Sequence, residues 1–532
     1  MFKNLFCFGT IVTVSLMSQI VFAQQSCESL KDLKLSRTSI TSAAMVPAGP
    51  FSATDAGPGG AANTPTITVP AHCEVKGVIR PSRDSEIKFA VWLPATGWNG
   101  KYVQEGNGGW AGSIPYRSMI DPLSRGYATA ATDDGHEGGL GAAWAIGHPE
   151  KLIDFGYRAV HETSVQAKVI TRALYGRDPS LSYFAGCSDG GREALMEAQR
   201  YPEDFNGILA GAPANNWSHL FTGFVWNEHA LLNSPGSNIP PAKLPTIQKT
   251  VLAGCDSQDG LKDGLLENPR TCLFDPAVLL CKGNESSDCL TPPQVEALKK
   301  VYTGPKNSRT GEQIFPGYPP GAEAVPGTWA TWITPANAAN AIQFNFGNTY
   351  YGQAVFEDPK WDFRRLNFDT DVQFGDDKVG SILNSTSPDL RSFRAEGGKL
   401  IQYHGWGDAA ISAINSVDYY TSVQAFLSKF PDPRSAAAGS VSDFYRLFMV
   451  PGMGHCGGGA GPNSFDAFSA LETWVEKGVA PAQIVGTGPV SGDPSKKMTR
   501  PLCPYPSVAR YKGTGDPNDA ANFSCTGAPN RQ

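Results

Sequence analysis

A serine that could act as a nucleophile lies in the segment Gly186-Cys187-Ser188-Asp189-Gly190. Its hydroxyl could attack an acyl carbon, provided that a neighbouring base removes the proton. The Gly-x-Ser-x-Gly spacing allows a sharp turn between a strand and a helix, with the serine exposed at its apex. The spacing alone is a weak signal in a chain that contains 58 glycines. An ordinary strand-to-helix turn capped by Ser188 is the alternative.

A base and an acid that could activate Ser188 follow it in the sequence. Asp408 stands in the turn HGWGD after the apolar segment 400–403, and His455 stands in the turn PGMGHC after the segment 444–450. The order serine, acid, histidine is that of the α/β-hydrolase fold, in which each residue follows a strand. These residues are therefore predicted to be nucleophile, orienting acid and general base.

Two further histidines and a simpler role for Asp408 are the alternatives. Asp408 could merely cap a turn or a helix. His404 precedes Asp408 in the same turn, so a contact with the acid or with substrate suits it better than the role of base. His136, in the segment TDDGHEG, is expected to be a structural histidine.

Backbone N–H groups for an oxyanion hole are expected at two places, because acyl transfer needs donors for the negative oxygen of its intermediate. The residue after the nucleophile, here Asp189, commonly provides one of them. The loop after an earlier strand provides the second, and the segment GNGGW fits that role. Within this segment Gly109 is preferred to Gly108.

The elements that would position these residues alternate between strand-like and helical segments. Strand-like segments begin near Ile87 and recur as far as Pro213, with helical segments between them. Such alternation predicts an α/β fold with a parallel sheet. After Pro213 a long stretch rich in Pro, Asn, Gly and Trp interrupts the pattern, which resumes near residue 397.

The chain is therefore divided into an α/β-hydrolase catalytic domain and a large inserted lid. The catalytic domain is assigned to residues 24–215 and 397–532, and the lid to residues 216–396. An insertion of this size is expected on a loop at the carboxyl edge of the strands, because ligands bind there in such sheets.

Residues 1–23 have the pattern of a signal peptide. Lys3 precedes an apolar segment, and Val21-Phe22-Ala23 supplies the small residue of a cleavage site. The apolar segment is too short to span a bilayer. The mature chain is therefore expected to be secreted or periplasmic.

Charge and composition exclude several kinds of partner. Hydrophobic residues make up 41% and charged residues 18% of the chain, as in a globular protein. The net charge of -6 argues against binding to nucleic acid or to an anionic membrane. We expect a small-molecule partner and no organic cofactor, because serine chemistry needs none.

Eleven cysteines are present, and removal of Cys7 with the leader leaves ten, which suits an oxidising compartment. Cys187 precedes the serine and Cys456 follows the histidine, so a bridge between them would join the two loops. Sequence alone does not determine connectivity. Local spacing suggests the remaining pairs: Cys27 with Cys73, Cys255 with Cys272, Cys281 with Cys289, and Cys503 with Cys525.

An acidic loop, CDSQDGLKDGLLENPRTC, lies inside the inserted region. Its oxygen donors are the carboxylates of Asp256, Asp259 and Asp263 and the carbonyls of Leu261 and Leu265. Oxygen donors at near-regular spacing suit a structural Ca²⁺ ion. The loop is not an EF-hand, because its sixth position is Leu261 rather than glycine. A solvated acidic turn with Lys262 as a partial counter-charge is the alternative.

At these residues the chain resembles the tannase and feruloyl esterase family of α/β hydrolases. The segments GCSDGGRE, HGWGDAAIS and PGMGHC are similar to the family's Cys-Ser, Asp and His-Cys motif, and CDSQDGLKDG is similar to its calcium loop. The resemblance covers nearly the whole mature chain. It implies that Ser188, Asp408 and His455 are catalytic, that Cys187 and Cys456 are bridged, that the acidic loop binds calcium and that a lid sets the substrate.

The resemblance also implies a carboxylic ester hydrolase whose substrates carry an aromatic acyl group. Family members hydrolyse feruloyl and related hydroxycinnamoyl esters, galloyl esters of tannins, or mono(2-hydroxyethyl) terephthalate, and feruloyl-type esters are the expected substrates here. In members that act on the terephthalate monoester an aromatic residue follows the acid by three positions, whereas this chain has Ile411. Residues that could line an acyl pocket are Trp329, Trp332, Phe344, Tyr350 and Tyr351.

A calcium-dependent binding protein without catalysis is the main alternative from another class. The complete set of Ser188, Asp408 and His455 argues against it. A serine peptidase or an acyltransferase on the same fold is a further alternative, because both use the same three residue types.

Overall fold

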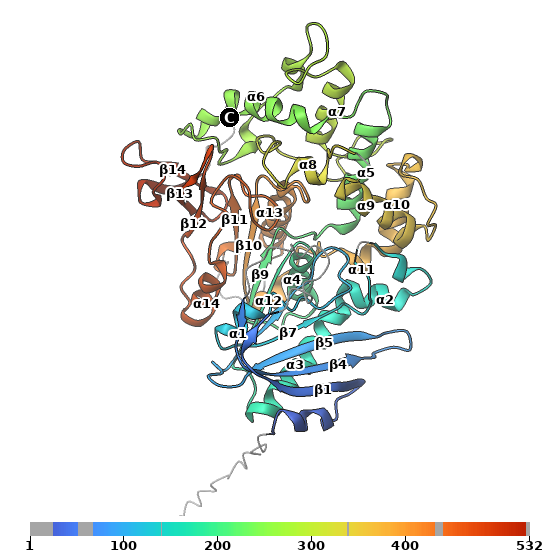
Figure 1. The fold of residues 1–532 in the computed structure, drawn as a ribbon, viewed down its shortest axis with the longest axis vertical. Coiled ribbons are helices and arrows are strands. Elements are labelled where there is room, and N and C mark those ends of the chain that lie inside the picture. Colours follow the sequence, from blue (N-terminus) through green and yellow to red (C-terminus); the bar gives the residue numbers. More distant parts are fainter. Residues whose placement is uncertain (1–24, 52–66, 140, 338–339, 431–439, 528–532) are drawn as a thin grey trace, which may run out of the picture.

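The computed structural model of the 532-residue chain describes residues 25–51, 67–139, 141–337, 340–430 and 440–527 (Figure 1). The signal peptide predicted over residues 1–23 lies outside them. Among the described residues, no helix is both long enough and apolar enough to cross a membrane.

A nine-stranded sheet forms the centre of the molecule, in the order β1-β4-β5-β7-β6-β8-β9-β10-β11. Its strands are Thr38–Val46 (β1), His72–Ile79 (β4), Ile87–Pro94 (β5), Lys101–Glu105 (β6), Ala128–Thr132 (β7), Leu181–Cys187 (β8), Gly207–Gly211 (β9), Lys399–Gly405 (β10) and Tyr445–Val450 (β11). Two short strands, Gly49–Pro50 (β2) and Thr68–Val69 (β3), pair beside it.

The sheet is mixed, whereas the alternation of strands and helices predicted a parallel one. Strands β7, β6, β8, β9, β10 and β11 are parallel, and β1, β4, β5 and β7 pair antiparallel. The prediction missed β1 and β4, which precede Ile87. β1 is an edge strand in which no residue is buried, so it lacks the apolar alternation that marks a half-buried strand.

Helices cover both faces of the sheet, because neighbouring residues of a strand point to opposite sides. Phe184 of β8 packs in the core that contains α3, α4 and α13, whereas the preceding Tyr183 packs in the core that contains α14. Burial of both faces is typical of parallel strands. The helices of this part are Ile120–Ser124 (α1), Pro149–Ile153 (α2), Ala159–Tyr175 (α3), Asp189–Arg200 (α4), Ala413–Lys429 (α13) and Ala467–Lys477 (α14).

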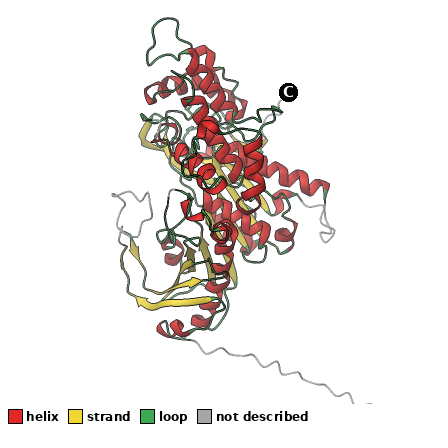
Figure 2. Ribbon diagram, turned by 90° about the vertical axis from the view of Figure 1, so that its right-hand side faces the viewer, coloured by secondary structure: helices red, strands yellow, loops and turns green. Residues whose placement is uncertain are grey.

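The inserted region leaves the sheet after β9 and returns at β10, and these two strands are neighbours in the sheet. Its helices are Trp217–Leu232 (α5), Leu244–Cys255 (α6), Pro292–Thr303 (α7), Trp329–Trp332 (α8), Ile342–Thr349 (α9), Thr370–Gly375 (α10), Ser381–Leu383 (α11) and Arg391–Ala395 (α12). Helices α5 to α10 gather at one end of the molecule, beyond the sheet, whereas α11 and α12 return beside α2 and α4 (Figures 1 and 2).

The C-terminal segment forms two hairpins that contact the acidic loop of the inserted region. Their strands are Ile484–Val490 (β12), Asp493–Leu502 (β13), Ser507–Tyr511 (β14) and Phe523–Gly527 (β15). Arg500 of β13 forms ion pairs with Asp263 and Glu267. Arg510 of β14 donates a hydrogen bond to the carbonyl of Asp259. The hairpins therefore tie the end of the chain to the inserted region.

Five disulfides join the ten described cysteines in the pairs that the sequence suggested. They are Cys27–Cys73, Cys187–Cys456, Cys255–Cys272, Cys281–Cys289 and Cys503–Cys525. Structural disulfides are typical of proteins that fold outside the cytoplasm.

Loss of the Cys27–Cys73 bridge is expected to destabilise the protein more than loss of Cys281–Cys289. The first bridge spans 46 residues of sequence and the second spans 8. Loop-closure entropy then gives stabilisations of roughly 4 and roughly 2.5 kcal/mol. Urea unfolding of the two paired Cys-to-Ser variants measures the difference, and equal losses would contradict the entropic explanation.

Candidate active site

Ser188 lies at a tight turn between β8 and α4. Its backbone φ is +67°, a left-handed value that is rare outside glycine. The flanking glycines are needed for space, because a Cβ on Gly186 would lie 2.5 Å from the carbonyl oxygen of Gly190. Ser188 directly precedes α4, yet its side chain makes no capping hydrogen bond. The geometry is that of a nucleophile elbow and not of a capped turn.

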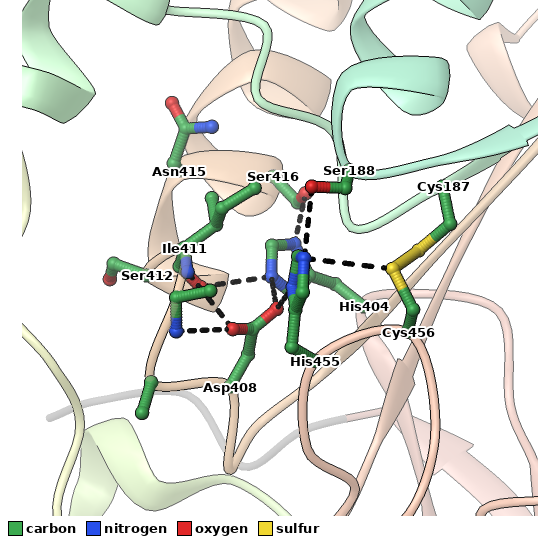
Figure 3. Close-up of polar contacts among 12 residues, drawn as sticks. Cys187, Ser188, His404, Asp408, Ile411, Ser412, Asn415, Ser416, His455 and Cys456 are labelled. Carbon is green, nitrogen blue, oxygen red and sulfur yellow. Dashed lines mark hydrogen bonds and ion pairs between the residues drawn. A yellow bond between two sulfur atoms is a disulfide. The ribbon is translucent and has the colours of Figure 1, made fainter. Parts of the chain in front are cut away.

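Ser188, His455 and Asp408 form a continuous hydrogen-bonded series (Figure 3). Ser188 Oγ lies 2.9 Å from His455 Nε2, and His455 Nδ1 lies 2.8 Å from Asp408 Oδ2. The three residues follow β8, β11 and β10, whose parallel carboxyl ends meet at one edge of the sheet. Ser188 and His455 are half-buried, whereas Asp408 is buried. The acid is thus shielded from water, whereas Ser188 and His455 keep part of their surface exposed.

Asp408 accepts hydrogen bonds on both carboxylate oxygens. Oδ1 accepts the backbone N–H groups of Ala410 and Ile411 at 2.7 and 2.9 Å. Oδ2 faces His404 and His455 at 3.1 and 2.8 Å. Burial acts to raise the pKa of Asp408, but the charge of His455 and the hydrogen bonds from both histidines outweigh burial and hold this pKa well below its usual range. The acid therefore stays ionised, as a residue that orients a base must.

His404 contacts the acid and not the hydroxyl. It is fully buried, and its Nε2 lies 3.1 Å from both Asp408 Oδ2 and the carbonyl oxygen of Ile411. Its Nδ1 lies 2.7 Å from Ser416 Oγ. Of the two contacts expected for His404, the structure contains the one with the acid. Ser416 carried no signal in the sequence, because it lies on α13 and reaches His404 only through the fold.

The Cys187–Cys456 disulfide joins the elbow to the histidine loop (Figure 3). Its two cysteines are 269 residues apart in the sequence and directly adjoin Ser188 and His455. Cys456 has a left-handed φ of +60°, and its Sγ lies 3.7 Å from His455 Nε2. The bridge therefore limits how far the two loops can separate.

The predicted oxyanion donors lie on segments beside Ser188. Asp189 is the first residue of α4, where backbone N–H groups have no partner within the helix. The N–H groups of Gly108 and Gly109 form no hydrogen bond with a backbone carbonyl of the described residues. Gly109 has a φ of +61°, and a Cβ there would lie 3.4 Å from the ring of Phe346. Assignment of the second donor to Gly109 stays a prediction.

Two aromatic side chains of the inserted region flank these residues. Trp332 of α8 packs against His455, with 5.3 Å between the ring centroids. Phe346 of α9 lies beside Gly109, and its ring is nearly parallel to that of Trp332. Trp332 was among the aromatic residues expected near an acyl pocket, whereas Phe346 was not. The other expected residues pack in apolar clusters built largely from the inserted region: Trp329, Phe344, Tyr350 and Tyr351.

His136 lies in the core and not at the hydroxyl. Its side chain is buried and stacks on Trp144, with 3.8 Å between the ring centroids. Burial lowers the pKa of His136 to about 4, so the imidazole is neutral at physiological pH. The structural role expected for His136 agrees with this placement.

The acidic loop of the inserted region turns its carboxylates onto its own backbone. A short turn, Asp256–Asp259, is followed by Gly260 and Gly264, which have φ values of +94° and +80°. Backbone N–H groups donate from Gly264 to Asp256, from Leu261 and Glu267 to Asp259, and from Leu265 to Asp263. The loop thus contains the carboxylate and carbonyl oxygens that a hard cation such as Ca²⁺ prefers as ligands, but its three aspartates do not place one oxygen each within 4.8 Å of the others.

Residues 73–526 match the family described as tannase and feruloyl esterase. The chain belongs to this family. Its relatives are named as esterases, so the protein is a carboxylic ester hydrolase. The resemblance seen in the sequence is thereby confirmed.

Three relatives illustrate the range of the family. An uncharacterised esterase of Xanthomonas campestris pv. campestris is 42% identical over 98% of this chain and 94% of its own. The mono(2-hydroxyethyl) terephthalate hydrolase of Piscinibacter sakaiensis is 34% identical over 95% of this chain and 92% of its own. A probable feruloyl esterase B-2 of Aspergillus oryzae is 31% identical over 96% of this chain and 97% of its own.

Solved structures share the fold. Feruloyl esterase B from Aspergillus oryzae superposes with a TM-score of 0.83 at 27% identity, covering 94% of this chain and 100% of its own. Tannin acyl hydrolase from Aspergillus niger superposes with a TM-score of 0.74 at 25% identity, covering 92% of each chain. The α/β-hydrolase fold predicted from the sequence is confirmed.

Asp408→Asn is expected to lower the free energy of unfolding most at neutral pH. A depressed pKa means that the carboxylate stabilises the folded state above the unfolded pKa of about 3.9, and that this contribution is lost as the pH falls through the folded pKa. Loss of the charged hydrogen bonds should cost about 2 kcal/mol at neutral pH. Urea unfolding of both proteins from neutral pH down to about pH 3 measures the difference, and a difference that does not shrink in acid would contradict the explanation.

Proposed function

We propose that the protein is a secreted serine esterase that hydrolyses esters of aromatic, feruloyl-type acids through an acyl-enzyme. The series Ser188, His455 and Asp408 carries this proposal, because its 2.9 and 2.8 Å contacts place a base beside the Ser188 hydroxyl and an orienting acid beside that base. Such chemistry requires no organic cofactor.

Acylation begins when His455 Nε2 takes the proton of Ser188 and the oxygen attacks the ester carbonyl carbon. The carbonyl electron pair moves onto its oxygen, and the N–H groups of Asp189 and Gly109 stabilise the negative charge. Collapse of this intermediate breaks the bond to the alcohol, which leaves with the proton from His455. The aromatic acid is then esterified to Ser188.

Deacylation repeats these steps with water as the nucleophile. His455 takes a proton from water as its oxygen attacks the acyl carbon, and Ser188 leaves and recovers that proton. The carboxylic acid is released and the enzyme is restored. Asp408 stays ionised and stabilises the imidazolium of His455 in both halves, while the Cys187–Cys456 bridge keeps the two loops together.

An aromatic acyl group is inferred from Trp332 and Phe346. Trp332 stands beside the base and Phe346 beside the oxyanion loop, with nearly parallel rings whose centroids lie 6.5 Å apart. When the ester carbonyl lies at Ser188, the aromatic ring of the acyl group would contact these two rings. Contacts between aromatic rings are more favourable than the burial of their apolar surface alone. The lid would in this way set the substrate.

Galloyl and terephthaloyl groups are the alternatives. One relative is named as a mono(2-hydroxyethyl) terephthalate hydrolase, and one structural neighbour is a tannin acyl hydrolase. Ile411, three residues after Asp408, is an aliphatic residue buried beside the aromatic cluster of the lid. An aromatic residue is expected there for the terephthalate monoester, so Ile411 argues against that substrate.

Export is inferred from two independent features. The leader pattern of residues 1–23 is that of a signal peptide. Five disulfides favour an oxidising compartment.

A structural calcium ion is proposed for the acidic loop. Its ligands would be the carboxylates of Asp256, Asp259 and Asp263 and the carbonyls of Leu261 and Leu265. When bound, the ion would supply positive charge to crowded carboxylates. Arg500 already pairs with Asp263, and Arg510 holds the carbonyl of Asp259, so the ion would fasten the lid to the C-terminal hairpins.

Ser188→Ala is expected to reduce hydrolysis of methyl ferulate by at least about 10⁴-fold, because the acyl-enzyme can no longer form. The unfolding transition should stay close to that of the wild type. A fluorophosphonate should label the wild type at Ser188 and leave the variant unlabelled. Undiminished turnover in the variant would contradict the proposed nucleophile, and an unlabelled, inactive wild type would favour a binding protein.

A panel of methyl ferulate, chlorogenate, methyl gallate and mono(2-hydroxyethyl) terephthalate tests the substrate class. The hydroxycinnamoyl esters should give the highest kcat/KM. Trp332→Ala should lower kcat/KM for all aromatic esters by about fivefold and leave that for an acetyl ester unchanged, because an aromatic contact contributes about 1 kcal/mol. Equal losses for aromatic and acetyl esters would show that Trp332 does not read the acyl group.

Removal of calcium by a chelator, or Asp259→Asn, is expected to lower the melting temperature while kcat at 25 °C changes little. A ligand that binds only the folded state at a hundredfold excess over its Kd stabilises it by about 2.7 kcal/mol. Asp288→Asn changes an exposed aspartate of the same region and serves as the control. A melting temperature indifferent to chelation and to Asp259→Asn would contradict the calcium proposal.

A further inference from the structure

Three carboxyl groups are buried together behind the nucleophile elbow. Asp134, in the loop after β7, meets Asp189 and Glu193 of α4, and one oxygen of each lies within 4.8 Å of the others. None of these residues is more than 2% exposed. Arg192 is also fully buried, and its Nε donates a hydrogen bond to Asp189 Oδ1 at 2.6 Å.

The cluster contains more acceptors than donors. Both oxygens of Asp134, Oδ2 of Asp189 and Oε1 of Glu193 accept no hydrogen bond from the described residues. Buried polar atoms are rarely left without a partner, and three buried carboxylates beside one guanidinium leave two negative charges unbalanced in an apolar interior. A proton retained on one carboxyl group removes a charge and supplies the missing donor.

Asp134 is the group that keeps this proton. Burial raises the pKa of Asp134 well above its usual value, and the charge of Glu193 and a hydrogen bond with it raise this pKa further. The charge of Asp189 acts in the same direction, whereas the nearby amide side chain of Asn107 opposes it. Asp134 is therefore a neutral carboxylic acid that can donate a hydrogen bond.

Glu193 also holds the loop that carries the predicted oxyanion donors. Its Oε2 accepts the backbone N–H of Asn107 at 3.0 Å, two residues before Gly109. The carbonyl of Asn107 accepts the N–H of Gly190, in the elbow, at 2.8 Å. Gly106 passes so close that a Cβ there would lie 2.7 Å from Glu193 Oε2. The loop thus rests directly on the Glu193 carboxylate.

We propose that Asp134 and Glu193 share a proton that positions the oxyanion loop. The O–H of Asp134 donates to the Glu193 carboxylate, which in turn accepts the N–H of Asn107. Both are positioning residues, since they act on the site through Asn107. This inference rests on the proposed function, because the Gly109 N–H stabilises an oxyanion only if the enzyme catalyses acyl transfer.

The backbone of Asp134 is fixed in an unusual conformation that suits this role. Its φ is +60°, in the left-handed region that Asp and Asn tolerate better than other non-glycine residues. Such conformations persist where the surroundings hold them, often at functional sites. The charged and titratable groups around it are Asp189, Arg192 and Glu193 on α4, Asp133 in its own loop, and Asp154 packed against Gly135.

Glu193→Gln tests the proposal by removing the charged acceptor while keeping the shape. We expect kcat for methyl ferulate to fall by about tenfold with KM nearly unchanged, because loss of an oxyanion donor costs 10²–10³ in kcat and a misplaced donor costs part of that. Glu197→Gln is the matched control: Glu197 lies one turn later on α4 and is equally buried, and the charged groups that act on it are Asp204, Lys168 and Glu193, none of which lies in the oxyanion loop. It should keep the kcat of the wild type.

Asp134→Asn is the second arm, because its amide donates to Glu193 at every pH and suits the left-handed backbone. Unlike Glu193→Gln, it should keep most of the kcat of the wild type. The wild type should lose kcat at alkaline pH as Asp134 releases its proton, and Asp134→Asn should extend the plateau to higher pH. The pH profile of Asp134→Asn decides the matter even where Glu193→Gln does not fold.

The proposal of a shared proton would be overturned if folded Glu193→Gln had the kcat of the wild type. It would also be overturned if the alkaline limb of the kcat–pH profile were the same in Asp134→Asn and the wild type. An equal loss of kcat in Glu193→Gln and Glu197→Gln would show a general effect of α4 and would overturn it as well. Ser188→Ala separates this failure from failure of the proposed function: if that variant is inactive while Glu193→Gln is fully active, only the positioning role is lost.

Discussion

The buried charge of Asp408 is the constraint on which the rest of the site depends. An ionised carboxylate is costly to bury unless donors surround it, and here two backbone N–H groups and two histidines do so. The backbone donors require the turn after β10 to fold over the side chain. His404 must be buried beneath it, with Ser416 of α13 on its far nitrogen. His455, on the same carboxylate, is half-exposed, and its Nε2 lies 2.9 Å from Ser188 Oγ.

Parallel strands explain how residues so far apart in the sequence meet. The turns after β8, β10 and β11 all open at one edge of the sheet, and the inserted region leaves from this edge after β9. It then crosses back beside α4 to the amino end of β10, which is parallel to β9. An insertion there brings Trp332 and Phe346 to the site without breaking any strand pairing. The Cys187–Cys456 bridge then links two turns of this edge covalently.

The sequence could predict the residues whose role depends on local pattern. Ser188, Asp408 and His455 each follow an apolar strand, and the cysteines beside two of them indicated the bridge. Residues that act through tertiary contacts left no such trace: Ser416, Phe346 and Asp134 become neighbours of the site only after α13, α9 and the loop after β7 have packed. β1 and β4 were missed for a related reason, because strand pairing and not apolar alternation defines them.

Asp408 and Asp134 are both almost completely buried near one hydroxyl, yet their pKa values shift in opposite directions. Burial acts to raise the pKa of both carboxyl groups, so the opposite shifts come from the groups that surround each of them. Donors crowd Asp408, whereas Asp134 faces two other carboxyl groups, Asp189 and Glu193. Asp408 is therefore an acceptor that can orient His455, and Asp134 is a donor that can hold Glu193. The same side chain takes opposite protonation states because the fold supplies hydrogen-bond donors to one and carboxylates to the other.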